Sequence, residues 1–172
     1  MYETMIDIET LNTTNKSVIF QVGLIFFDDT KQYKYIWNLD INEQLELGRT
    51  IDASTLAFHL KIPDNLLDSI EEQSHYPIIP FKVELEDLFL RFKPEACWSK
   101  GYFDFALLTD LLHGKVPWEF WTLRELRTIM KECNVQPSKE ATHNALEDCK
   151  DQIEQLLECR RKINERAQTD TK

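Results

Sequence analysis

Two acidic residues near the start of the chain, Asp7 and Glu9, are separated by one residue at the end of an apolar run that favours a β-strand. Because side chains two residues apart in a strand point to the same face, the two carboxylates would lie side by side. Adjacent carboxylates repel each other unless a cation lies between them. The pair therefore indicates either a site for a hard metal ion or a solvated strand end, and a spacing this short also arises by chance in a chain with 30 acidic residues.

A third carboxylate, Asp104, lies among aromatic residues in the segment 98–105, just after Gly101. One interpretation is that Asp104 caps the helix expected to follow it. The other is that it is a metal ligand, because apolar surroundings limit competing water and stiffen a carboxylate. The segment alone leaves both open.

A histidine and a further aspartate flank the start of the last expected helix. His143 comes just before the helix and Asp148 follows five residues later. We expect the positive end of the helix dipole to keep the imidazole neutral and able to accept a proton. Asp148 is beside Ala145 and Gln152 on the helix surface, close to the core-facing stripe, so it could reach a site on the sheet.

The elements that must position these residues are strands early in the chain and helices later. Strands are expected over 4–8, 17–27, 32–39 and 96–99, with a turn at 28–31. Helices are expected over 53–61 with Asp52 as the N-cap, after an N-cap at Asp64, over 83–92, over 103–112, over 123–133 with Thr122 as the cap, and from Ala145 onwards. This order predicts an α/β or α+β layer fold with one sheet covered by helices.

Composition excludes several classes of protein. With 172 residues, 42% of them hydrophobic, the chain suits one soluble domain, and its four glycines allow no Gly-rich phosphate loop. The four cysteines form no CxxC pair, and with no export signal we expect reduced thiols, a cytoplasmic protein and no membrane partner. The net charge of −10 differs from the basic footprint usual for nucleic-acid binders.

Taken together, the five candidate residues form a pattern that resembles the DEDDh exonucleases of the DnaQ-like superfamily. Asp-x-Glu on the first strand, an aspartate near the middle and His-x4-Asp at the last helix occur in the order and context of that family. Further stretches are similar to the phage exonuclease A and RNase AS subgroup, at 6–11, 21–23, 48–52, 55–56, 124–128 and 143–148. The resemblance covers residues 4 to 157. One departure is Phe58-His59, where the subgroup tends to carry tryptophans.

The resemblance implies an RNase H-like α/β fold, with a central mixed sheet flanked by helices. It implies one exonuclease domain, assigned to residues 1–160, and the run of charges after it predicts a frayed tail over 161–172. The activity implied is metal-dependent 3′–5′ hydrolysis of phosphodiester bonds at single-stranded 3′ ends, releasing nucleoside 5′-monophosphates. DNA is slightly favoured because of the phage-type similarity, with a host cytoplasmic location if the chain is phage-encoded.

Two alternatives stay open beside this function. One is a 3′–5′ exoribonuclease of the RNase AS or oligoribonuclease type, since few local contacts sense a 2′-hydroxyl. The other is a non-catalytic nucleic-acid-binding module on the same fold. The subgroup includes homodimers, so a homodimer is a possible assembly.

The resemblance also implies roles for the five residues. Asp7 is shared between two divalent cations, Glu9 and Asp148 complete the first site, and Asp104 holds the second. His143 is the general base that takes a proton from the attacking water. The carboxylate-rich, sulfur-free donor set points independently to Mg²⁺ or Mn²⁺ rather than zinc.

Substrate contacts are expected around these residues. By resemblance, Thr10 and Leu11 meet the terminal nucleotide through backbone amides and an apolar wedge between bases. Trp98, Tyr102 and Phe103 could stack on bases or belong to the core.

Two polar residues complete the expected substrate set. Arg127 could meet a phosphate or pair with an acid. Asn144, within the histidine motif, is also expected at the substrate site.

Overall fold

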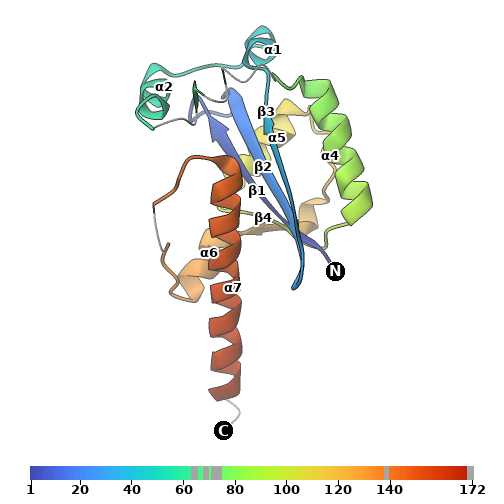
Figure 1. Ribbon diagram of the computed structural model, residues 1–172, viewed down its shortest axis with the longest axis vertical. Helices are drawn as coiled ribbons and strands as arrows, with labels where there is room; N and C mark the ends of the chain where they lie inside the picture. Colours follow the sequence, from blue (N-terminus) through green and yellow to red (C-terminus); the bar gives the residue numbers. More distant parts are fainter. Residues whose placement is uncertain (63–65, 68–69, 71–74, 138–139, 170–172) are drawn as a thin grey trace.

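The computed structural model describes residues 1–62, 66–67, 70, 75–137 and 140–169, and it contains a five-stranded sheet with helices on both faces (Figure 1). The strand order is β3-β2-β1-β4-β5. Strands β1, β2 and β3 pair antiparallel, whereas β4 runs parallel to β1 and to β5. The predicted class, a mixed α/β fold with a central mixed sheet flanked by helices, is confirmed and is compatible with an RNase H-like fold.

The elements follow the expected order along most of the chain. The strands are β1 (Glu3–Thr10), β2 (Ile19–Phe27), β3 (Gln32–Asn38), β4 (Cys97–Ser99) and β5 (Leu123–Glu125). The helices are α1 (Ile41–Glu46), α2 (Ala53–His59), α4 (Ile78–Phe92), α5 (Tyr102–Leu111), α6 (Leu126–Glu132) and α7 (Ala145–Thr169), with a 3-10 turn at Phe120–Thr122. Asp52 caps α2 as predicted, by accepting the N–H of Thr55, whereas the expected N-cap Asp64 lies outside the described residues.

The expected helix over 123–133 with Thr122 as its cap is wrong at its start. Residues 123–125 form β5, which pairs with β4 at the edge of the sheet. Glu125 caps α6 instead, because its carboxylate accepts the backbone N–H groups of both Arg127 and Thr128. Pairing with a neighbouring strand here overrides the local helical pattern.

The last helix, α7, continues to Thr169, so the tail expected to fray from Arg160 is helical in this structure. Arg161 forms ion pairs with Glu158 and Glu165, which lie one turn away on either side. Such pairs stabilise an exposed helix. Figure 1 shows this end of α7 projecting beyond the sheet. The division into a domain over 1–160 and a tail over 161–172 stays a prediction.

The four cysteines, expected as reduced thiols, are free and buried. In the part of the chain that the structure describes, no helix is long and apolar enough to cross a membrane.

The alternation of side chains along β1 decides which residues face α7. Ile6 and Ile8 pack into the hydrophobic cluster that includes α4 and α5. Met5 packs into the cluster on the other face, formed with α6 and α7. Asp7 and Glu9 share the face of Met5, because successive side chains in a strand alternate. The predicted carboxylate pair therefore points toward α7.

The first turn of α7 lies unusually close to β2, at a position that has no side chain. A Cβ on Gly23 would lie 2.4 Å from the backbone carbonyl carbon and oxygen of Ala145 and 2.7 Å from the nitrogen of Leu146. Beside it, the Gln21 side-chain oxygen accepts the N–H of Ala145 at 2.9 Å. This bond satisfies one of the donors that a helix N-terminus leaves free. Together these contacts fix the start of α7 on the sheet.

Replacing Gly23 tests this close approach. In Gly23→Ala the new methyl group meets backbone atoms, which cannot rotate away as a flexible side chain can. We expect the free energy of unfolding, measured by urea denaturation, to fall by about 1–3 kcal/mol. Gly101→Ala is the control, because its Cβ would lie 3.5 Å from the flexible guanidinium group of Arg127, the nearest group beyond its chain neighbours, and its φ of −176° suits any residue. Equal stabilities of the two variants would contradict the proposed docking.

Candidate active site

A cleft of about 510 Å³ opens where β1 ends and α7 begins. Its walls come from β1, the β4–α5 connection, the start of α6 and the first turns of α7. All five residues singled out by their chemistry line this cleft, namely Asp7, Glu9, Asp104, His143 and Asp148. The structure therefore brings together groups that are up to 141 positions apart in the sequence.

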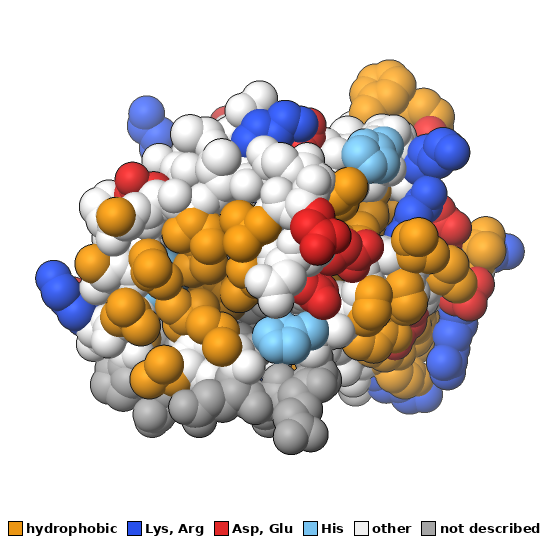
Figure 2. Space-filling model, turned by 90° about the horizontal axis from the view of Figure 1, so that it is seen from above, with side chains coloured by type: hydrophobic (Ala, Val, Ile, Leu, Met, Phe, Trp, Pro, Cys, Tyr) orange, Lys and Arg blue, Asp and Glu red, His pale blue; other side chains and the backbone are white. Residues whose placement is uncertain are grey.

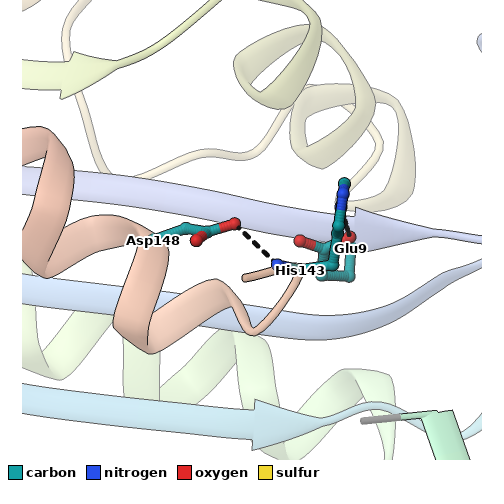
Figure 3. Close-up of side chains that lie close together, drawn as sticks. All are labelled: Glu9, His143 and Asp148. Atoms are coloured by element: carbon teal, nitrogen blue, oxygen red, sulfur yellow. Dashed lines mark hydrogen bonds and ion pairs between the residues drawn. The ribbon is translucent and has the colours of Figure 1, made fainter. Parts of the chain in front are cut away.

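Three of these side chains form the tightest group, Glu9 on β1, His143 before α7 and Asp148 on α7 (Figure 3). One potential ligand atom from each lies within 4.8 Å of the others. His143 Nδ1 is 3.7 Å from Glu9 Oε2. Two carboxylates and an imidazole at this separation can share a metal ion.

The turn before α7 is held by the helix's own aspartate. Asp148 Oδ1 accepts the N–H and the hydroxyl of Thr142, both at 2.8 Å, and Oδ2 accepts the N–H of His143 at 3.1 Å. His143 has a φ of 56°, in the left-handed region that non-glycine residues rarely adopt. These hydrogen bonds hold that conformation, which directs the imidazole toward β1.

The carboxyl groups of the cleft oppose one another's ionisation. Burial raises the pKa of Asp7 well above its ordinary value, and the charges of Asp104 and Glu9 raise it further. Burial also raises the pKa of Asp104 to about 7, with Glu9 adding to the effect and Arg127 opposing it. Divalent cations would relieve this repulsion, and an all-oxygen carboxylate set is the kind that Mg²⁺ and Mn²⁺ prefer. The residues present therefore fit such ions.

The pKa of His143 moves in the direction opposite to the one expected from the helix dipole. The hydrogen bond and negative charge of Glu9 raise the pKa of His143, with Asp148 adding, while burial opposes them. In the absence of a cation, the expectation that the helix dipole keeps His143 neutral is therefore wrong. The full charge of a carboxylate outweighs the partial charge of a helix end.

Two residues of this region were not singled out from the sequence. His59 on α2 is 4% exposed, and its Nε2 lies 3.9 Å from Glu9 Oε2, the same oxygen that His143 Nδ1 faces. Gln152 on α7 donates a hydrogen bond from Nε2 to Asp7 Oδ1 at 2.6 Å. In the sequence, His59 was marked only by the difference of Phe58-His59 from the subgroup that the chain resembles. Gln152 was marked only by its position one turn after Asp148.

Hydrophobic surface adjoins the acidic groups. On the end of the molecule viewed in Figure 2, hydrophobic side chains lie on either side of a group of acidic ones. Phe103 is 42% exposed and lines the cleft, and Phe58 is exposed with its ring centroid 4.8 Å from that of His143. Tyr102 is exposed but lies outside the cleft walls. Arg127 lines the cleft, and its role toward a phosphate stays a prediction.

Two of the residues expected to contact a substrate have side chains in the core. Leu11 is 1% exposed and packs with Val18, Phe20 and Leu66, so it offers no wedge. Trp98 is 8% exposed and its Nε1 donates to the Glu3 carboxylate, away from the cleft. In both cases burial against neighbouring elements takes the apolar surface that a base would need.

The remaining two expected contacts make local hydrogen bonds outside the cleft walls. The hydroxyl of Thr10 donates to the backbone oxygen of Asn12 at 2.8 Å. The side-chain oxygen of Asn144 accepts the N–H of Glu147 at 3.1 Å, and so caps α7. Their roles toward a substrate stay predictions.

A comparison with known protein families matches most of the chain. The model of a family described as the 3′–5′ exoribonuclease Rv2179c-like domain matches residues 2–159. That range includes every residue placed in the cleft above. A search of curated proteins found no match.

The cleft should destabilise the cation-free protein at alkaline pH. The folded-state pKa of Asp104, about 7, lies above its ordinary value of 3.8, so stability is lost as pH rises through 7 and Asp104 ionises. Asp104→Asn removes the cost of a buried, ionised carboxylate. In EDTA at pH 8, we expect this variant to raise the thermal unfolding midpoint by about 2–4 °C for each 1 kcal/mol of that cost. At pH 5 the difference from the unsubstituted protein should shrink.

The control for this experiment lies at the other end of the same helix. The pKa of Asp110 is lowered by hydrogen bonds and charge from Lys16 and Arg49, so its ionised form stabilises the fold. Asp110→Asn should therefore lower the unfolding midpoint at pH 8. A fall of the midpoint in Asp104→Asn as well would refute the electrostatic description of the cleft.

Proposed function

The chain belongs to the Rv2179c-like family of 3′–5′ exoribonuclease domains, and we propose that it is a metal-dependent 3′–5′ exoribonuclease of the DEDDh type. The observation that carries this proposal is the meeting of four carboxyl groups and His143 in one cleft. Ionised carboxyls crowded together are costly unless a cation binds, and strongly shifted pKa values cluster at functional sites. A passive binding module needs no such arrangement.

The four carboxylates would hold two divalent cations, Mg²⁺ or Mn²⁺. Asp7 would be shared, Glu9 and Asp148 would complete one site, and Asp104 would hold the other. When bound, such a pair of ions activates the attacking water and stabilises the charge on the phosphoryl and leaving oxygens. Ligand atoms of Glu9, Asp148 and His143 lie within 4.8 Å of one another, which supports the first of these sites.

His143 would act as the general base. Glu9 faces its Nδ1, which orients the ring and leaves Nε2 to take the proton from water. The side chain is about one-third exposed, so solvent can reach it. Cations on Glu9 and Asp148 would offset the negative charge that raises the pKa of His143, and so favour the neutral base.

RNA is the substrate that the family description supports. The expectation of DNA rests on similarity to phage exonuclease A alone and stays open to the assay below. Phe103, exposed at the cleft, would stack on an unpaired base, and Arg127 would meet a phosphate. The products would be nucleoside 5′-monophosphates.

A nuclease assay tests the proposed activity. Single-stranded RNA labelled at its 5′ end should be shortened stepwise from its 3′ end in Mg²⁺ or Mn²⁺. The ladder should vanish in EDTA and in Asp7→Ala, because both remove the shared cation site. The matched DNA measures sugar preference, and a ladder that survives EDTA would exclude the metal-dependent proposal.

Substitution of the histidine separates proton transfer from cation binding. His143→Ala should lower turnover by about 10²–10⁴-fold, the usual contribution of a positioned general base. Mn²⁺ binding, measured by calorimetry, should change little because the carboxylates remain. His113→Asn, at an exposed histidine outside the cleft, is the control. Full turnover in His143→Ala would rule out its role as the base.

A further inference from the structure

One uncharged side chain in the cleft wall is bonded to the carboxylate that both cations would share. Gln152 lies on α7, is 3% exposed, and donates from Nε2 to Asp7 Oδ1 at 2.6 Å. Its other polar atom, Oε1, is buried and has no hydrogen-bond partner among the described residues. An unpaired buried oxygen destabilises a fold, so stability alone does not account for an amide at this position.

Two other carboxylates of the cleft have more than one partner. Glu9 Oε2 lies near nitrogens of both His59 and His143, and Asp148 accepts three hydrogen bonds from the turn before α7. Within the described part of the chain, Gln152 is the side chain that donates a hydrogen bond to the Asp7 carboxylate. The orientation of Asp7 therefore depends on a single side chain, Gln152, in a way that Glu9 and Asp148 do not share.

We propose that Gln152 is the positioning residue of Asp7, whose N–H fixes the rotation of the carboxylate so that both oxygens are ready for two cations. This inference rests on the proposed function. The bond restrains Oδ1 from the side of α7, and no donor to Oδ2 is found among the described residues. A carboxylate fixed in this way binds cations without first losing rotational freedom.

The spacing on α7 links this role to a cation ligand. Asp148 and Gln152 are four residues apart, so they lie on one face of the helix. One rigid helix thus supplies a ligand of its own and orients a ligand on β1. Loss of such an outer partner lowers metal affinity or activity by about 10–100-fold in metal sites generally.

The same helix offers a matched control. Gln155 is 6% exposed, lines the same cleft and also has a buried Oε1 without a partner. It makes no hydrogen bond to Asp7 among the described residues. If a buried amide served only to fill space in this wall, substitutions at the two positions would have similar effects.

The experiment compares Gln152→Met with Gln155→Met, using Mn²⁺ alone as the probe. Free Mn²⁺ is measured by electron paramagnetic resonance and binding heat by calorimetry, without substrate. Gln152→Met should raise the Mn²⁺ dissociation constant about 10–100-fold, whereas Gln155→Met should bind Mn²⁺ like the unsubstituted protein. In EDTA Gln155→Met should not unfold at a lower temperature, because it loses an unpaired buried oxygen, and Mn²⁺ binding is measured well below the unfolding midpoint of each variant.

A shorter amide separates reach from polarity. Gln152→Asn keeps the amide but withdraws it by one methylene, so it should lose Mn²⁺ affinity as Gln152→Met does. The inference would be overturned if Gln152→Met and Gln152→Asn both kept a Mn²⁺ affinity within about twofold of that of the unsubstituted protein. It would also be overturned if Gln155→Met lost as much Mn²⁺ affinity as Gln152→Met. Absence of Mn²⁺ binding and RNA cleavage in the unsubstituted protein would instead overturn the proposed function.

Discussion

The first turn of α7 rests against the backbone of β2 at a place where only a glycine leaves room. Gly23 permits the contact, and the Gln21 side chain fixes it by accepting the N–H of Ala145. From this point α7 carries Asp148 along β1, while the turn before it carries His143. A shift of the helix would move these groups together relative to Glu9. The geometry of the cleft thus depends on backbone packing more than on any pair of polar side chains.

The same packing forces negative charges together. Burial and mutual repulsion raise the pKa values of Asp7, Glu9 and Asp104, so the cleft is unfavourable at neutral pH without cations. Hydrophobic clusters on both faces of the sheet hold the backbone against this repulsion. Part of the net charge of −10 therefore lies in the cleft that is proposed to hold cations, so the net charge alone does not argue against an anionic substrate.

The local sequence pattern was sufficient to place a residue where the direction of its side chain follows from the strand or helix that contains it. Strand alternation placed Asp7 and Glu9 on one face, and helical spacing placed Asp148 toward the sheet. It failed where a distant segment decides the outcome: Leu11 and Trp98 look suited to bases, yet neighbouring elements bury them. The contacts of His59 and Gln152 join segments 50 and 145 positions apart, which no local pattern encodes.

The central claim is that carboxylates from β1, α5 and α7 form one site for two cations. Anomalous diffraction from crystals grown with Mn²⁺ and a nucleoside 5′-monophosphate tests it most directly. Two peaks are predicted, one contacting Asp7, Glu9 and Asp148 and the other contacting Asp7 and Asp104. No peak in the cleft, or Mn²⁺ held only by residues elsewhere, would contradict the account.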